Sequence, residues 1–444
     1  MTNGAATSKL RRTLRYPDLV VYGLAYIAPY ALLSTLGFVW KTSNGLIVLA
    51  YLLSTVCMYF TAKSYAVMSE SVPQAGSVYG FARHALGALP GFVAGWMVLL
   101  DYLLVPAFLY LIVAVAANEL LPSIGRATSV VLLAAITLGI NWFGIRVSSR
   151  VNFFSVGVQV VVIGGMMILG VVALLRGFGN GGLTLAPIWN SAAFSFSGMA
   201  SATSICIMSF LGFDAISTLS EEVAGDDPSV VGRAIVSALL IAALFFAAGS
   251  FVLGNMLPGI TIHDPAAAGY ELATAAFGAW AASAIAWANV GVVGIANALP
   301  MQIGVARVLF AMGRDRQLPH VLARIHGKYG TPWVSMLVAS AISTAVALAL
   351  QDRIDDLANI VNFGALSAFL MLHVSVIAEF GIRRRSRRWF VHWATPILGA
   401  LVVLMVLKGM SRVAATVGVA WLLVGIIWGL VLHARERGAA SPPH

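Results

Sequence analysis

The feature that most constrains this chain is the recurrence of apolar stretches of about 20 residues, each long enough to cross the hydrocarbon core of a bilayer. They follow one another from Asp18 to His433, separated by short polar joints. The chain is 60% hydrophobic and 10% charged, with a mean hydropathy of +0.90, whereas a soluble domain carries about 25% charged residues. We therefore predict an all-α membrane protein with about twelve transmembrane helices and no separate soluble domain beside them.

The predicted spans are separated by joints that carry most of the charge. In order, they cover residues 18–40, 46–69, 90–119, 127–145, 151–175, 198–220, 231–256, 278–312, 333–350, 357–381, 393–410 and 412–433. No cleavage site precedes the first span, so we expect no removable signal peptide. The two cysteines, Cys57 and Cys206, fall inside spans and are expected to be small apolar fillers rather than a disulfide or metal site.

The net charge of +10 is distributed in a way that predicts topology. If the N-terminus is cytoplasmic, most of the 27 Lys and Arg residues lie on the cytoplasmic side, as the positive-inside rule expects. The exceptions are Lys41, Arg126, Arg176, Arg353, Lys408 and Arg412. No surface that interleaves basic and aromatic residues is evident, which argues against nucleic acid as a partner. We predict a multi-pass protein of a bacterial-type inner membrane, with both termini cytoplasmic.

Two of the spans are interrupted halfway along. In the first, Pro29 lacks an amide hydrogen and clashes with the preceding helical turn, although a harmless kink is the alternative. In the sixth, Asp214 follows Gly212 by two residues in an otherwise apolar segment. A carboxylate at that depth costs about 2.5 to 3.5 kcal/mol on insertion scales, so we expect it to face a cavity or a partner. Both helices are predicted to be broken and to line a solute site.

Broken helices five spans apart are typical of inverted-repeat transporters. We therefore predict a five-plus-five inverted-repeat (LeuT-like) fold with broken helices 1 and 6, followed by helices 11 and 12. The predicted divisions are a cytoplasmic N-terminal tail at 1–17, a transporter core at 18–381 with repeats at 18–175 and 198–381, helices 11 and 12 at 382–433, and a cytoplasmic C-terminal tail at 434–444.

Two joints carry motifs that resemble a known family. The joint after the second span contains Pro73, Gly76, Tyr79 and Gly87, and the joint after the eighth contains Arg314-Asp-Arg-Gln-Leu-Pro319, followed by Thr331-Pro332. Together they resemble the amino acid-polyamine-organocation (APC) superfamily of secondary transporters, across residues 18–433. Within it the chain is similar to bacterial putrescine importers, through Gly23 to Tyr26 with Pro29, Gly95-Trp96, Leu99 to Tyr102 with Pro106, Gly212 to Asp214, Ser220 to Glu222, and Val361 to Ala365. The resemblance implies the APC fold and an amine substrate.

The broken first helix departs from the pattern of relatives that bind amino acids. Many of them hold the substrate carboxylate on bare amides of a Gly-x-Gly turn, aided by the positive helix end. This chain has Gly23 there, but Ala25 and Tyr26 follow, and Pro29 offers no amide hydrogen. The amide of Ala25 can still bind a carboxylate, so both substrate classes stay open, with a pure amine favoured.

A diamine such as putrescine needs an acceptor for each ammonium group and an apolar or aromatic wall between them. Asp101 in the third span and Asp214 in the sixth are the predicted acceptors. The predicted wall and hydrogen-bonding residues are Tyr26, Tyr102, Tyr110, Phe210, Phe213, Asn297 and Asn362. For Asp101, the aromatic residues and the asparagines, packing or bonding between helices is the alternative role.

Glu221 and Glu222 end the sixth span and are predicted to act in gating or proton coupling together with Asp214. Arg83 and Arg307 are the candidate partners of the two glutamates, and a solvated helix end is the alternative. The resemblance to importers implies that one of this pair is the proton or substrate carboxylate. His373 is expected to be a hydrogen-bonded core residue rather than a proton relay.

Coupling to protons is favoured over coupling to sodium. Some proton-coupled relatives place a lysine in the fifth span where this chain has Gln159, so a carboxylate that exchanges a proton, Asp214 or Glu222, is the predicted substitute. Sodium would need hydroxyl and carbonyl ligands from the first and eighth spans, and the eighth has no Ser-Thr pair in its inner half.

These observations predict a secondary active transporter that imports a small organic amine, putrescine or a related polyamine, by alternating access. An amino acid permease or exchanger of the same fold is the first alternative. A membrane sensor that binds the solute without moving it is the second. No metal cluster, phosphate loop or nucleophile-base set is found, so we predict neither an enzyme nor a cofactor.

Overall fold

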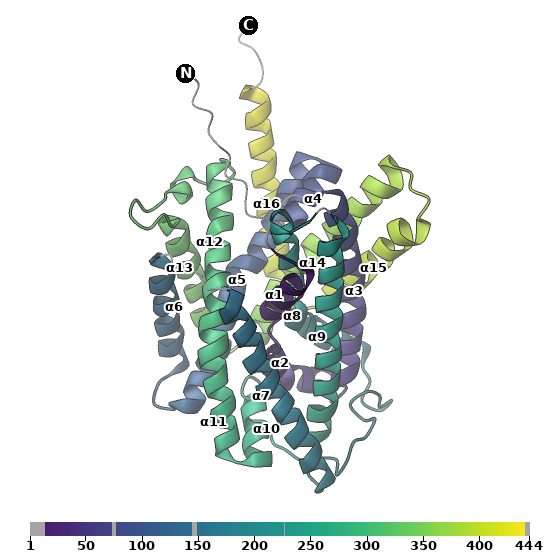
Figure 1. Ribbon diagram of the computed structural model, residues 1–444, viewed down its shortest axis with the longest axis vertical. Helices are drawn as coiled ribbons and strands as arrows, with labels where there is room; N and C mark the ends of the chain where they lie inside the picture. Colours follow the sequence, from purple (N-terminus) through teal and green to yellow (C-terminus); the bar gives the residue numbers. More distant parts are fainter. Residues whose placement is uncertain (1–13, 73–76, 144–148, 226, 440–444) are drawn as a thin grey trace.

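The computed structural model describes residues 14–72, 77–143, 149–225 and 227–439, which form helices joined by short loops (Figure 1). The α-helices are α1 (Tyr16–Ile27), α2 (Ala31–Thr42), α3 (Ile47–Ser71), α4 (Ser77–Leu86), α5 (Ala88–Leu120), α6 (Arg126–Trp142), α7 (Ser149–Leu175), α8 (Phe196–Phe210), α9 (Ser229–Met256), α10 (Ala268–Phe277), α11 (Ala279–Ala288), α12 (Ala298–Arg314), α13 (Trp333–Ala349), α14 (Ile354–Val376), α15 (Thr395–Lys408) and α16 (Arg412–Ala439). The 3₁₀ segments are η1 (Phe213–Glu222) and η3 (His320–Ala323), and the π-helical segments are η2 (Asn289–Asn297), η4 (Ile377–Arg383) and η5 (Phe390–Ala394). The all-α prediction is confirmed.

The predicted spans are recovered in order. Among the described residues, nine helices are long and apolar enough to cross a membrane, and the bent pair α1 and α2 makes a tenth. The remaining two predicted spans correspond to α6 and α13, apolar helices of 17 residues each. The prediction of about twelve spans agrees with this arrangement.

Two helices appear where the sequence analysis described only joints. Helix α4 follows the second span and packs against the start of α5, and α10 follows the seventh span and packs against α2. Both are only 10 residues long. Pro73 and Gly76 of the joint motif, and the terminal tails at 1–13 and 440–444, lie outside the described residues.

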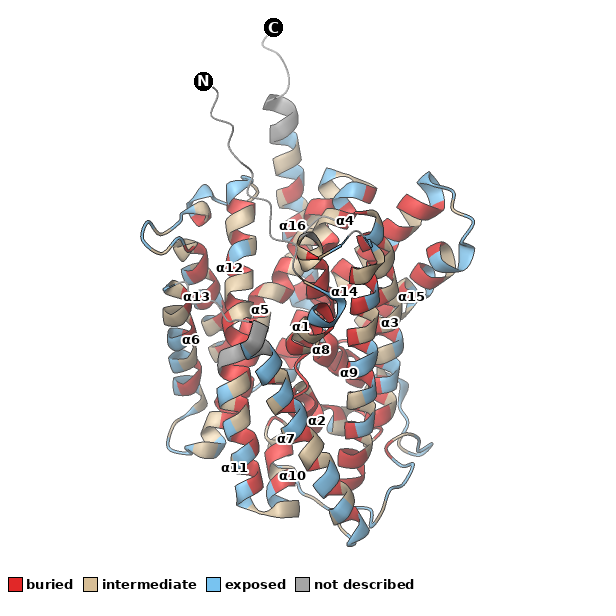
Figure 2. Ribbon diagram, in the orientation of Figure 1, coloured by how far each residue is buried: buried red, intermediate tan, exposed pale blue. Residues whose placement is uncertain are grey.

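The bundle has a buried centre and a perimeter that faces lipid. Over their most apolar stretches, α5 and the sixth span are each 83% buried, whereas α16 is 17% buried and α7 is 28% buried. Figure 2 shows the same contrast, with buried residues gathered on the central helices and exposed ones along α7. Because lipid tails are as apolar as leucine, the exposed leucines and valines of the perimeter helices carry no penalty there.

The first span is broken as Pro29 predicted. Helix α1 ends at Ile27, and the axis turns by 46° into α2. Ala28 has a positive φ of 55°, and its N–H donates to the oxygen of Leu24. Because Pro29 has no amide hydrogen and Ala28 leaves the helical conformation, the helix cannot continue through this point.

The sixth span is broken at Gly212. Helix α8 ends at Phe210, and the chain resumes as the tighter η1 at Phe213. Gly212 has a φ of 116°, and a Cβ added there would lie 2.8 Å from the Cβ of Tyr26. Only glycine therefore gives both the turn and the close approach to α1.

The two broken helices cross side by side in opposite directions. Helix α1, the first half of span one, contacts η1, the second half of span six, while α2 contacts α8. This antiparallel crossing is the arrangement that an inverted repeat generates. The exact repeat boundaries stay a prediction.

Candidate functional site

A cavity of about 330 Å³ opens beside the break in the sixth span. It lies between α1, α5, η1 and α12. Its polar lining consists of Tyr22, Tyr26, Asp101, Tyr102, Asp214, Thr218, Glu222 and Arg307. The structure therefore brings together both carboxylates and two of the aromatic residues, Tyr26 and Tyr102, that the sequence analysis assigned to one site.

Asp101 lies on α5 and is 7% exposed. Its Oδ1 atom is buried and has no hydrogen-bond partner among the described residues. Helix α14 packs tightly on this part of α5, because a Cβ at Gly364 would lie 2.9 Å from the Asp101 nitrogen. A buried carboxylate oxygen without a donor is costly, so a cationic guest in the cavity would satisfy it.

Asp214 lies in the first turn of η1, directly after the break. Its Oδ1 accepts a hydrogen bond from the Gly212 N–H at 3.2 Å, and its own carbonyl accepts one from the Ser217 hydroxyl at 2.6 Å. The side chain of Asp214 therefore folds back toward Gly212, over the N-terminal end of η1. The bond from Gly212 occupies one of the about four acceptor positions of the carboxylate.

Tyrosine rings provide the aromatic part of the wall. The rings of Tyr22 and Tyr26, one helical turn apart on α1, have centroids 4.8 Å apart. Tyr102 follows Asp101 on α5 and lines the same cavity. Ring faces attract ammonium groups by about 0.5 to 2 kcal/mol per good contact, so this wall suits a cation.

Glu222 and Arg307 line the cavity where η1 ends. Arg307 is exposed, and the described residues include no ion pair between the two. The backbone next to Glu222 is fixed, because the N–H of Leu14 donates to its carbonyl at 3.0 Å and the N–H of Ala224 donates to Leu14 O at 2.8 Å. The side chain of Glu221 lies outside the described residues, and Arg83 donates instead to the Tyr79 hydroxyl at 2.7 Å.

A smaller cavity of about 60 Å³ continues on the other side of the break. The two cavities share Tyr26, Val105, Leu211 and Met301, which form the constriction between them. Asn297 lines the smaller cavity, and its buried Nδ2 has no partner in the described part of the chain.

A buried polar network borders this smaller cavity, because Tyr30 belongs to both. The hydroxyls of Tyr30 and Tyr270 are 2.6 Å apart, and Asn289 Nδ2 donates to the Tyr270 hydroxyl at 2.8 Å. Gln159 Oε1 accepts from the Tyr30 N–H at 3.1 Å. The network joins the break in span one to α7, α10 and η2, so we name these four residues the tyrosine latch.

Several predicted site residues lie away from both cavities. Tyr110 is fully buried, with its hydroxyl 3.1 Å from Thr137 on α6. It follows Asp101 by nine residues, or 2.5 helical turns, and therefore projects from the opposite side of α5. Asn362 donates to the carbonyl of Ser204, which ties α14 to α8.

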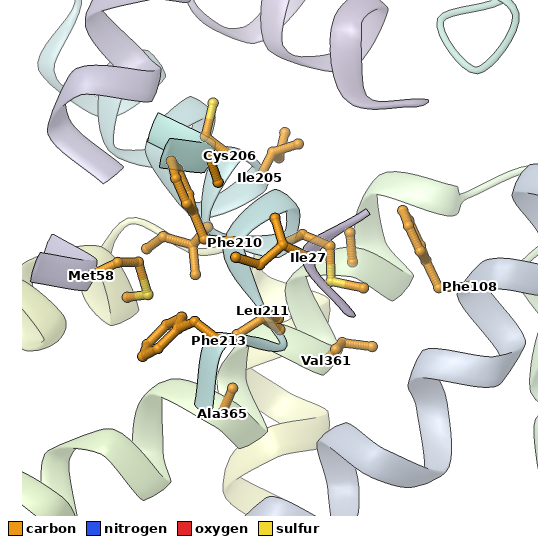
Figure 3. Close-up of a cluster of buried hydrophobic side chains, with 14 of the residues drawn as sticks. Ile27, Met58, Phe108, Ile205, Cys206, Phe210, Leu211, Phe213, Val361 and Ala365 are labelled. Atoms are coloured by element: carbon orange, nitrogen blue, oxygen red, sulfur yellow. The ribbon is translucent and has the colours of Figure 1, made fainter. Parts of the chain in front are cut away.

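Ala25, Phe210 and Phe213 are buried and line neither cavity. Figure 3 shows Phe210 and Phe213 in an apolar cluster around the break, together with Ile27, Leu211 and residues of α14. The ring of Phe210 packs against Phe246 at 5.1 Å. Their contribution to the site remains a prediction.

Two residues of the site were not singled out from the sequence. Tyr22 lines the larger cavity, and Asn289 belongs to the tyrosine latch. Tyr22 precedes Tyr26 by four residues, which places both on one helix face, so the spacing could have revealed it. Asn289 precedes Asn297 by eight residues in an apolar stretch, and this repeat of a lone polar residue was a comparable signal.

The other polar candidates have structural partners. His373 is fully buried, with Nδ1 2.9 Å from the Ser64 hydroxyl. Cys57 and Cys206 are both buried and free. Across the described ranges, no group of three His, Cys, Asp or Glu side chains could hold a metal ion.

A helical membrane bundle with two opposed broken helices and an acidic cavity between them is the architecture of a secondary transporter. The chain matches the family described as Amino acid permease over residues 19–432, and it belongs to this family of the APC superfamily. The predicted family membership is therefore confirmed, and the chain is a transporter rather than an enzyme.

Three bacterial relatives illustrate the range of solutes in this family. The chain is 31% identical to the low-affinity putrescine importer PlaP of Escherichia coli (strain K12), over 96% of this chain and 95% of the relative. It is 27% identical to the branched-chain amino acid permease BcaP of Bacillus subtilis (strain 168), over 95% and 94% of the two chains. It is 26% identical to the methylthioribose transporter of the same organism, over 95% and 93%.

Proposed function

We propose that this transporter imports a small organic amine of the putrescine or polyamine type, coupled to protons, by alternating access. The observation that carries the proposal is the lining of one cavity by Asp101 and Asp214, two of its three carboxylates, with tyrosines beside them; Glu222 is the third. A diamine would offer one ammonium group to each carboxylate, while its methylenes contact the tyrosine rings. The 31% identity to a putrescine importer supports the same substrate class.

The backbone at the breaks supports an amine rather than a carboxylate substrate. In span one, the Ala28 N–H donates to Leu24, the Tyr30 N–H donates to Gln159, and Pro29 has none. In span six, the Gly212 N–H already donates to Asp214. These amides, which would have to hold a substrate carboxylate, are thus engaged within the protein, and the carboxylates of the cavity would repel one.

The two unequal cavities support alternating access. The larger one extends along η1 to Glu222 and Arg307, whereas the smaller one is lined by Tyr30 of the tyrosine latch. This asymmetry corresponds to a conformation open toward the end of the bundle that holds η1. Breaking the tyrosine latch while closing the Glu222 end would expose the same carboxylates to the opposite side.

We further propose that this open end is cytoplasmic and that the protein resides in a bacterial-type inner membrane. The end of α12, the end of α16 and the turn between α14 and α15 lie at one end of the bundle, together with α4 (Figure 1). These segments carry most of the clustered arginines, which the positive-inside rule assigns to the cytoplasm. Asp214 or Glu222 is the proposed carrier of the coupled proton.

Uptake by proteoliposomes tests the function. Purified protein would be reconstituted with an imposed pH gradient, acidic outside, and given labelled putrescine, spermidine, leucine or arginine. We expect accumulation of the amines that a protonophore abolishes. Uptake of an amino acid without uptake of any amine would overturn the proposal in favour of the amino acid permease, which the 27% identity to BcaP favours. Binding without accumulation would favour the sensor.

A further inference from the structure

A dense run of arginines separates the last helix pair from the transporter core. Five of the six residues from Arg383 to Arg388 are arginines, and Ile382, Trp389 and Phe390 flank them. We name residues 382–390 the arginine turn. All five arginines and the three flanking apolar side chains are exposed.

A single buried carboxylate holds one end of the arginine turn. Glu379, in the π-helical η4, accepts from Arg384 Nε at 2.9 Å and from an Arg383 nitrogen at 3.3 Å. Arg383 also donates to the carbonyl of His84, and Arg384 donates to the hydroxyl of Ser71. These two arginines therefore fasten the turn to α3 and α4, and their positions are fixed by the protein itself.

The rest of the turn carries uncompensated positive charge. Arg385, Arg387 and Arg388 form no ion pair with any described residue. Glu70 interacts electrostatically with Arg388, whereas no described carboxylate forms an ion pair with Arg385 or Arg387. Arg385 also has a φ of 47°, a left-handed conformation that is unfavourable for arginine. The turn thus presents a cluster of cations that the fold does not neutralise.

The location of the turn identifies the environment of these cations. It lies at the rim of the bundle, away from the cavity, next to α15 (Figure 1). On α15, Ile397, Leu398, Leu401 and Leu404 are exposed, which marks the face in contact with lipid tails. Trp389 is 66% exposed and Phe390 is 67% exposed. Exposed aromatic residues at the end of a lipid-facing helix are typical of the membrane interface, where headgroups lie.

We propose that the arginine turn is a binding site for the phosphate headgroups of acidic phospholipids in the adjacent leaflet. Guanidinium groups match phosphate oxygens by bidentate hydrogen bonds. Trp389 and Phe390 insert beside the acyl chains, and Arg385, Arg387 and Arg388 contact the headgroups of phosphatidylglycerol or cardiolipin. The site is separate from the solute cavity and does not depend on the identity of the solute.

Retention of lipid by the purified protein tests this site without any transport measurement. Detergent-solubilised protein would be titrated with phosphatidylglycerol and, separately, with phosphatidylethanolamine, and bound lipids counted by native mass spectrometry. The test variant is the double substitution Arg385→Gln and Arg387→Gln, which leaves both partners of Glu379 intact. The matched control is Arg316→Gln with Arg324→Gln, two exposed arginines in the connection between α12 and α13, of which Arg316 also has a positive φ of 58°.

We expect the wild type to bind phosphatidylglycerol in preference to phosphatidylethanolamine. A basic residue near an acidic lipid surface contributes about 1 kcal/mol, or about fivefold, so the test variant should lose about 30-fold in affinity for phosphatidylglycerol while the control changes little. Equal losses in both variants would mean that overall charge, not this turn, attracts the lipid, and the proposal would be wrong. No preference for phosphatidylglycerol in the wild type would overturn the proposal as well.

Discussion

Asp101 is the proposed acceptor of the second ammonium group of a diamine, and replacing it by asparagine isolates that role. The substitution keeps the size of the side chain and removes its charge. Opposite charges 4 Å apart attract by about 4 kcal/mol at an effective dielectric constant of 20. The ammonium group also loses water on binding, so the range of 1.5 to 3 kcal/mol found for hydrogen bonds to charged groups is the better guide.

This energy corresponds to a loss of about 10- to 150-fold in affinity. We expect the loss for putrescine but not for butylamine, which has the same four carbons and a single ammonium group held by Asp214. Little of the gain is spent on desolvating Asp101, because its Oδ1 is already buried and has no partner in the described part of the chain. Isothermal titration calorimetry of the purified protein with both ligands measures the difference.

The matched control is Glu119→Gln, which removes a carboxylate from the exposed end of the same helix. It should leave both affinities unchanged. The reasoning would be refuted if Asp101→Asn weakened putrescine and butylamine equally, since the residue would then serve the fold of the cavity. Unchanged binding of putrescine would refute it too.

Further predictions concern the breaks and the tyrosine latch. Asp214→Asn should abolish amine uptake with normal membrane insertion, as measured by labelled uptake and immunoblotting of membranes; retained uptake would remove Asp214 from the site. Gly212→Ala should destabilise the protein by about 2 to 5 kcal/mol, because the added methyl group strains the backbone and contacts α1. The control Gly157→Ala, whose added Cβ meets no atom within 4 Å, should not destabilise it. Equal melting temperatures of the two variants would contradict this prediction. Tyr270→Phe removes the partner of the Tyr30 hydroxyl and should destabilise the closed network by about 1 to 3 kcal/mol. A cysteine engineered into the smaller cavity should then react faster with a reagent added outside. An unchanged rate of labelling would argue against a latch.

The breaks in spans one and six were predictable because their causes are local. Pro29 removes a donor, and Asp214 is a charge that an apolar helix cannot carry toward lipid. The short helices α4 and α10 were not predicted. Each has only 10 residues and lies in a joint between spans, where helix formation depends on packing against α5 or α2.

The composition of the cavity was only partly predictable. Asp101 and Tyr110 lie on the same helix, and both were assigned to the site, yet only Asp101 reaches the cavity. On a soluble helix, a polar stripe would have identified the outer face. Helix α5 has no such stripe, because it is surrounded by other apolar helices and is 83% buried over its most apolar stretch.

The sequence alone determined that this chain is a bundle of about twelve membrane helices. It also determined the places where two of these helices break and the superfamily to which the chain belongs. Those properties follow from the length of apolar runs, from proline and glycine, and from motifs in the joints. The tertiary structure decided which side chains share the cavity, that Asp101 has an oxygen with no donor among the described residues, and that the residues of the tyrosine latch meet in one network. The physical reason is that lipid and protein interior are equally apolar, so hydrophobicity cannot tell one face of a membrane helix from another, and only packing assigns the faces.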